Sequence, residues 1–378
     1  MESYLKSLLF SVIRSGIEIS DLSYPISDED VNSLFEIAKA QSILPLFLRG
    51  IKRASVQTIK IPSEYEKVYL KDTYRSVQFE ETLKQIKSVF NEFDIPFMLL
   101  KGAVLRDLYP DAFTRTSCDL DILVHESDLN KAVSAIESKV GFKEHARGYH
   151  DIAMINSRFR LELHFSLKEN MEKIDCLLAD VWNYAIPVDN SCQYEMSTEY
   201  LIFHVLAHMS FHMTHGGIGI RPLIDLWLLN NKTSYDKNKL MKILSDTGLN
   251  IFYDKATRLV DSWMSDKAID VDLIEFENYC LSSGVFGDKK NAALSQVRNK
   301  SKAKYIFNRL FVQRSYLEEL YPALKNKPYL LPLYQIKRWI RLSDSKRMKK
   351  AHNELEVAIN ATQEEKENVD LLLKSLGF

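Results

Sequence analysis

The chain has 378 residues and nearly balanced charge, with 50 Lys and Arg against 51 Asp and Glu and a formal net charge of −1. This length predicts two or three domains. The charge balance excludes a global electrostatic field that would favour nucleic acid or an anionic membrane. The cysteines, Cys118, Cys176, Cys192 and Cys280, form no CxxC pair, which argues against a zinc ribbon or disulfide framework and indicates a reducing compartment.

The N-terminal segment, residues 1–14, carries charges inside its apolar run and lacks a small-residue cleavage site. It therefore predicts an amphipathic helix and not a signal peptide. No stretch of the sequence approaches the length of a transmembrane span. We expect a soluble, cytoplasmic protein without a membrane partner.

The periodicity predicts an α+β protein in three parts: an N-terminal helical region at 1–92, an α/β core with a small mixed sheet at 93–190, and a C-terminal helical domain at 191–378. In the first part, Ser27 caps one helix and a second runs from Pro62 to Phe93.

Turn and cap residues divide the core into short elements. In chain order these are a strand at 97–100, a turn at Gly102, a brief helix at 103–108, a strand at 120–124, a helix at 127–140 capped by Ser127 and closed by Gly141, and a hairpin of 150–156 with 159–167. The C-terminal part begins with a helix at 198–213 and a second helix with Pro222 in its first turn.

Asp119 and Asp121 stand two residues apart at the beginning of an apolar strand. Residues i and i+2 of a strand share one face, so both carboxylates project together. Two close negative charges repel, and their desolvation is costly. A divalent cation between them removes both penalties, and oxygen-only ligation suits Mg²⁺. Alone, an Asp-x-Asp at a strand start is more often a solvated turn.

The hairpin supplies a third acid. Strand alternation puts Arg160, Glu162 and His164 on one face, opposite Leu161 and Leu163. A lone Glu in a strand is usually exposed. If this strand pairs beside 120–124, however, Glu162 lies next to the aspartates.

Lys101-Gly102, Arg115, Asp119-Leu-Asp121 and Glu162-Leu-His164 resemble the DNA polymerase β-like nucleotidyltransferase superfamily, in particular its poorly characterised bacterial branch. The resemblance extends to the helical segments at 199–208 and 221–226. It implies a Mg²⁺-dependent, nucleotide-binding enzyme that uses an NTP donor such as ATP.

The same resemblance implies a role for each residue. Asp119 and Asp121 would hold two Mg²⁺ ions on the triphosphate, and Glu162 would be the third carboxylate, which binds metal and helps to deprotonate the acceptor hydroxyl. Lys101, Gly102 and Arg115 would contact phosphate, as would His164. Lys101-Gly102 stands where the superfamily usually has Gly-Ser or Gly-Gly, so one hydroxyl donor is missing and the Lys101 charge would replace it.

His204, His208 and His212 recur at i, i+4 and i+8, on one helical face. Metal ligation is one interpretation of this spacing, but no H-E-x-x-H pattern accompanies it. Structural packing is a second, and contact of His208 and His212 with substrate phosphate is a third, which the resemblance favours.

Two hypotheses follow. The first is an enzyme that transfers a nucleoside monophosphate from an NTP to a hydroxyl of a small molecule, a protein or an RNA end, releasing pyrophosphate. The second is a catalytically degenerate module that binds nucleotide or protein. The carboxylate trio favours the first hypothesis, and the altered Gly-Ser turn favours the second.

Overall fold

The computed structural model describes residues 3–22, 26–54, 61–117, 119–284, 314–324, 326–342 and 362–378, and single positions among 287–312 and at 360. The chain divides into two compact units. The first comprises Met1–Phe211 and Gly219–Val285, and the second His212–Ile218 and Phe286–Phe378. The three-part division of the sequence stays a prediction.

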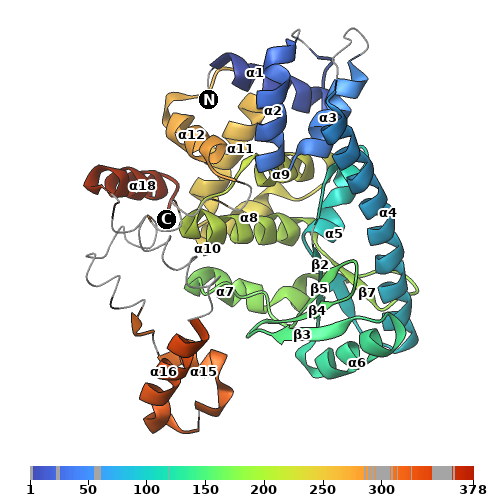
Figure 1. The fold of residues 1–378 in the computed structure, drawn as a ribbon, viewed down its shortest axis with the longest axis vertical. Helices are drawn as coiled ribbons and strands as arrows, with labels where there is room; N and C mark the ends of the chain where they lie inside the picture. The colour runs from blue at the N-terminus through green and yellow to red at the C-terminus, as the bar shows by residue number, and fades with distance from the viewer. Residues whose placement is uncertain are drawn as a thin grey trace. The chain divides into compact units, whose positions relative to one another are not determined.

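The first unit contains a seven-stranded mixed sheet (Figure 1), in the order β3-β4-β5-β2-β1-β7-β6. This architecture confirms the predicted α+β class. The strands are β1 (Phe97–Leu99), β2 (Asp119–Val124), β3 (Lys143–Arg147), β4 (Asp151–Ile155), β5 (Arg160–His164), β6 (Ala185–Pro187) and β7 (Gln193–Met196).

The central strand β2 pairs with β1 antiparallel and with β5 parallel. Its apolar residues Leu120, Ile122 and Val124 are fully buried. They enter one core cluster with Leu161 and Leu163 of β5. Because strand side chains alternate, Asp119, Asp121, Glu162 and His164 lie on the opposite face.

Helices α4 (Ser63–Glu92) and α6 (Leu129–Lys139) contribute the helical side of that core, through residues such as Phe90 and Ile136 (Figure 1). The α4 bounds confirm the predicted helix after Pro62. The predicted Ser127 cap is wrong, since a 3₁₀ turn at Glu126–Asp128 precedes α6. Gly141 closes α6 as predicted, with φ of +81° and its N–H donating to the Ile136 carbonyl.

The predicted hairpin is β4–β5. At its turn the Asn156 Oδ1 accepts hydrogen bonds from the Arg158 and Phe159 N–H groups, each at 2.8 Å. This Asx turn fixes the register of β4 against β5 and so the position of Glu162.

The first unit contains further α-helices. Ser27 caps α2 as predicted, since its hydroxyl accepts from the Asp30 N–H. Pro222 lies in the first turn of α9, also as predicted. These helices are α1 (Ser3–Gly16), α2 (Asp28–Ala40), α3 (Leu44–Arg53), α5 (Gly102–Leu105), α7 (Glu172–Ala179), α8 (Thr198–His215, whose last residues belong to the second unit), α9 (Ile220–Lys232), α10 (Lys237–Thr247), α11 (Asn250–Ser265) and α12 (Ile274–Ser282).

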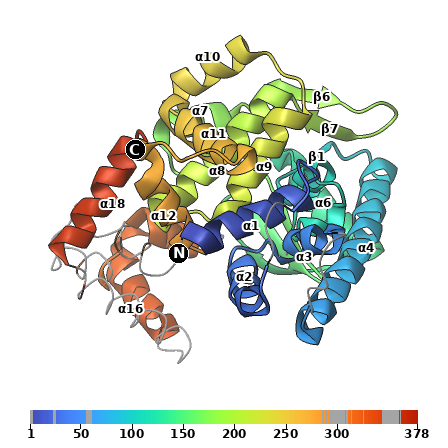
Figure 2. The same cartoon turned by 90° about the horizontal axis from the view of Figure 1, so that it is seen from above.

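Three strands lie outside the sequence prediction. Strand β3 is exposed throughout and lies at one edge of the sheet, where charged side chains protect an unpaired edge and hide the strand from pattern analysis. Strands β6 and β7 form a hairpin at the other edge (Figure 2).

The described part of the second unit contains α15 (Arg314–Leu320), α16 (Leu331–Leu342) and α18 (Gln363–Ser375). The rings of Tyr321 and Tyr334 pack at 4.9 Å between centroids, and the Trp339 indole N–H donates to the Leu310 carbonyl.

None of the described helices combines the length and apolarity that crossing a bilayer requires. Cys176, Cys192 and Cys280 are free thiols, and Cys118 lies outside the described residues.

Candidate functional site

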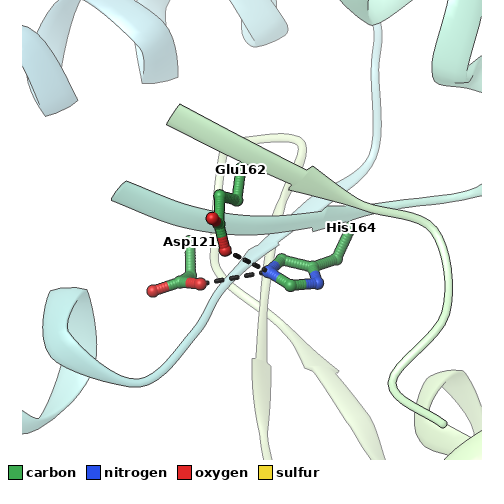
Figure 3. Close-up of side chains that lie close together, drawn as sticks. All are labelled: Asp121, Glu162 and His164. Carbon is green, nitrogen blue, oxygen red and sulfur yellow. Dashed lines mark hydrogen bonds and ion pairs between the residues drawn. The ribbon is translucent and has the colours of Figure 1, made fainter. Parts of the chain in front are cut away.

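The parallel pairing of β2 with β5 brings two of the three predicted carboxylates, Asp121 and Glu162, into one cluster, which does not include Asp119. The register sets Asp119 opposite Arg160, Asp121 opposite Glu162 and Leu123 opposite His164. Figure 3 shows Asp121 and Glu162 extending from neighbouring strands into one space, with the His164 imidazole beside them. One ligand atom from each of these three side chains lies within 4.8 Å of the other two.

Asp121 is the buried centre of this group, with 7% of its surface exposed. Its Oδ1 lies 3.1 Å from Lys101 Nζ and 3.0 Å from His164 Nε2. Burial by itself would raise the pKa of Asp121, but the positive charge of Lys101 and the His164 hydrogen bond hold it well below its usual range. Asp121 is therefore a carboxylate at neutral pH.

Asp119 lies nearer the surface. Partial burial raises its pKa, and the negative charges of Glu162 and Asp121 raise it further. Glu162 itself accepts a hydrogen bond at 2.8 Å from Arg160. Three carboxylates thus repel one another at one end of two strands. Two carboxylates and an imidazole that converge on one space are a donor set that fits a divalent cation.

Lys101 occupies a strained turn between β1 and α5. Its φ is +44° and its ψ is −113°, a conformation that costs a non-glycine residue on the order of 1–3 kcal/mol. The carbonyl of Lys101 accepts from the Leu105 N–H at 2.9 Å. Although burial opposes its charge, the pKa of Lys101 is raised by Asp121. The strained turn therefore directs a charged ammonium at the central carboxylate.

Gly102 is needed for close packing. A Cβ at this position would lie 2.2 Å from Ser117 Oγ and 2.9 Å from Arg115 Nη1. The Ser117 hydroxyl therefore fills the volume that a side chain at position 102 would take. The next two amides, of Ala103 and Val104, already donate to carbonyls of Leu100 and Lys101.

Arg115 forms a buried ion pair across 110 residues of sequence. Its Nε and Nη2 each lie 2.9 Å from a different carboxylate oxygen of Asp225 on α9. The Tyr109 hydroxyl donates to the same carboxylate at 2.8 Å. This bidentate contact ties the segment before β2 to α9. The role of Arg115 in phosphate binding stays a prediction.

A cavity of about 200 Å³ has Ser117 and Arg115, the two neighbours of Gly102, in its wall. Its charged residues are mainly basic, and hydroxyl groups accompany them. The charged residues are Lys39, Asp72, Arg75, Arg106 and Arg115, and the hydroxyl residues are Ser42, Ser76, Thr116 and Ser117. Lys39, Arg75 and Arg106 were not predicted, since they come from separate helical segments.

Arg106 is the most buried of these unpredicted cations, with 3% of its surface exposed. It pairs with Glu80 at 3.1 Å and lies over the Phe79 ring. Its Nε has no hydrogen-bond partner among the described residues, and burial lowers the pKa of its guanidinium. An anion in the cavity would add to the compensation that Glu80 gives this charge.

Two of the predicted histidines lie in the first unit. His208 Nδ1 is 3.0 Å from Glu169 Oε1. His204 is 5% exposed, and its Nδ1 has no hydrogen-bond partner among the described residues. Burial lowers the pKa of both imidazoles to about 3, and the Lys101 charge contributes. His212 falls in the second unit. Phosphate contact by His208 and His212 stays a prediction.

The sequence model of one protein family, described as "uncharacterised nucleotidyltransferase", matches residues 27–265. This is more than half of the chain. The chain belongs to that family. The matched region contains the Lys101-Gly102 turn, all three carboxylates and Asp225, and the match confirms the family resemblance of the sequence. No curated protein and no solved structure matches the chain.

We predict that Asp225→Ala lowers the free energy of unfolding by about 3–5 kcal/mol, because it leaves the Arg115 guanidinium buried and uncompensated. Urea denaturation measures the change. The control is the double variant Arg115→Met, Asp225→Leu, which removes both charges and should be more stable than Asp225→Ala. A double variant as unstable as the single one would contradict a dominant role of the ion pair.

We also predict acid destabilisation through His204. Unfolding restores the ordinary pKa of about 6.5, so between pH 6.5 and 3 the unfolded chain binds a proton that the folded chain does not. As the pH is lowered through this range, the free energy of unfolding therefore decreases, by up to about 1.4 kcal/mol per pH unit for this group. His204→Leu should flatten the pH dependence, whereas His145→Leu, at an exposed position of β3, should leave it unchanged. Equal slopes in all three proteins would refute the prediction.

Proposed function

We propose that the chain is a divalent-cation-dependent nucleotidyltransferase that transfers a nucleoside monophosphate from an NTP to a hydroxyl group and releases pyrophosphate. The observation that carries the proposal is the in-register pairing of Asp121 with Glu162, with Asp119 two residues earlier on the same face. The family match supports the reaction class. The cation, the acceptor and pyrophosphate release are proposals.

The carboxylates of Asp119, Asp121 and Glu162 would hold Mg²⁺, two ions in the full complex. When bound, such ions stabilise negative charge on the attacking and leaving oxygens of an in-line displacement. The strands hold Asp121 and Glu162 rigidly, so little reorganisation is needed on substrate binding.

In the transfer, the acceptor oxygen forms a bond to the α-phosphorus, and the bond from that phosphorus to the β-phosphate oxygen breaks. Glu162 would take the acceptor proton, a role supported by its being less buried than Asp121 and lying on the adjacent strand. Lys101 keeps Asp121 ionised by its charge. Glu162 and Asp121 therefore have different tasks in the proposed mechanism: Glu162 takes a proton, and Asp121 stays ionised to hold the cation.

The basic cavity beside Gly102 would receive the outer phosphates of the NTP. Ser117 supplies a hydroxyl where the superfamily pattern would have one at position 102. Arg75 and Arg106 add positive charge. Charged donors on phosphate are among the stronger hydrogen bonds in proteins. This arrangement supports an active site despite the altered Gly-Ser turn.

We predict that Asp121→Asn abolishes Mg²⁺-dependent NTP binding measured by calorimetry. Glu162→Gln should instead lower pyrophosphate release at least about tenfold, as for loss of general-base assistance, with a much smaller change in NTP affinity. The assay offers water and small polyols such as glycerol as trial acceptors.

The matched control for these acids is Glu144→Gln, on the exposed edge strand β3, which should behave as the parent chain. Normal NTP binding by Asp121→Asn would sink the site assignment. NTP binding by the parent chain without any turnover across a broad acceptor panel would favour the degenerate binding module instead.

A further prediction concerns the cavity. Arg75→Gln should weaken NTP binding about tenfold, the equivalent of about 1.4 kcal/mol, while nucleoside binding stays unchanged. Lys71→Gln, one turn away on α4 at an exposed position outside the cavity, is the control. Equal NTP affinities of the Arg75 and Lys71 variants would place the outer phosphates elsewhere.

A further inference from the structure

We propose that His164 is a direct metal ligand and that Asp121, Glu162 and His164 form a mixed carboxylate–imidazole site that binds Mn²⁺ more tightly than Mg²⁺. This inference rests on the cation site of the proposed function, but not on nucleotidyl transfer. It gives His164 a different role from the phosphate contact expected from the sequence.

The geometry of the imidazole carries the inference. His164 Nε2 lies 3.0 Å from Asp121 Oδ1 and 3.7 Å from Glu162 Oε2, so one nitrogen faces both carboxylates (Figure 3). Adjacent ligands of an octahedral ion with bonds of about 2.1 Å are themselves about 3 Å apart. The nitrogen therefore stands close to the separation from Asp121 that one ion requires and within 1 Å of it for Glu162, and the two carboxylates lie within 4.8 Å of each other.

The surroundings hold this imidazole in place. His164 is 5% exposed. Its ring stacks nearly parallel on His150, with 5.8 Å between centroids and 10° between planes. The strand pairing fixes its backbone opposite Leu123. A buried ring held by stacking and by strand pairing is preorganised to present Nε2 to the space between the carboxylates.

Charge also favours an ion here. Asp119, Asp121 and Glu162 place three carboxylates at the ends of β2 and β5. The cations that contact them among the described residues are Lys101 on Asp121 and Arg160 on Glu162. A divalent ion at Asp121 and Glu162 would neutralise the excess negative charge without requiring a charged imidazole, because Nε2 would then be a ligand.

The chemistry of the donors determines the preferred ion. Mg²⁺ prefers oxygen ligands and gains little from nitrogen. Mn²⁺ shares the preference of Mg²⁺ for carboxylates and water in octahedral geometry, but as a transition-metal ion it gains more than Mg²⁺ does from a nitrogen ligand. Asp119 and Asp121 remain an oxygen-only pair suited to Mg²⁺ on a triphosphate. The Asp119–Asp121 pair therefore favours Mg²⁺, and the group of Asp121, Glu162 and His164 favours Mn²⁺.

The test is pulsed electron paramagnetic resonance of the full chain with Mn²⁺ alone, without nucleotide. Directly bound imidazole gives nitrogen modulation of the Mn²⁺ echo, and ¹⁵N-histidine labelling changes its frequencies. We expect this signal in the parent chain and in His145→Gln, at an exposed position of β3, and its loss in His164→Gln. Calorimetry should show Mn²⁺ binding weakened roughly tenfold or more in His164→Gln, with Mg²⁺ affinity little changed.

Each other outcome overturns the inference. Bound Mn²⁺ without nitrogen modulation in the parent chain means a carboxylate-only site, a result that does not depend on any variant folding. Modulation that persists in His164→Gln assigns the nitrogen to another histidine, and absence of Mn²⁺ binding removes the site. Turnover with Mg²⁺ but no nitrogen ligand would leave the proposed function standing, whereas a nitrogen ligand without NTP binding would leave only this inference.

Discussion

The parallel pairing of β2 with β5 is the constraint on which the rest of the candidate site depends. It places Asp121 beside Glu162 and leaves Asp119 on the same face, while Leu120 and Leu161 are buried on the other. A shift of one residue would turn the carboxylates into the apolar core, so the burial of these leucines also specifies the register of the acids. The fold thereby brings together charges that repel one another.

That repulsion explains the arrangement around Asp121. Its carboxylate contacts the Lys101 ammonium and the His164 imidazole. Lys101 follows β1 and His164 belongs to β5, the two strands that flank β2. The Lys101 backbone is strained in the same turn. Strain of this kind persists where the surrounding structure enforces it, and it is concentrated at functional sites. In the proposed mechanism, Lys101 in the turn compensates the charge of Asp121, and the basic cavity compensates the charge of the substrate phosphates.

Local sequence patterns were sufficient to predict which side chains share a strand face and where several helices end. Strand alternation predicted that Glu162 and His164 share a face, and caps such as Ser27 and Gly141 located helix ends. The pairing of β5 with β2 could not be predicted from local patterns, because strand pairing is a tertiary property. The Arg115–Asp225 pair spans 110 residues, so no local spacing indicates it. The packing of Ser117 into the space beside Gly102 is hidden for the same reason. Strand β3 is hidden for another reason, since its side chains are exposed and show no apolar alternation.

Calorimetric titration of the full chain with each of the four NTPs, first with Mg²⁺ and then with EDTA, tests the central claim most directly. We predict that at least one NTP binds and that chelation of the cation abolishes its binding, because the carboxylates of β2 and β5 repel a bare triphosphate. Binding of equal strength in EDTA, or binding of none of the four, would contradict a cation-dependent nucleotide site at Asp119, Asp121 and Glu162.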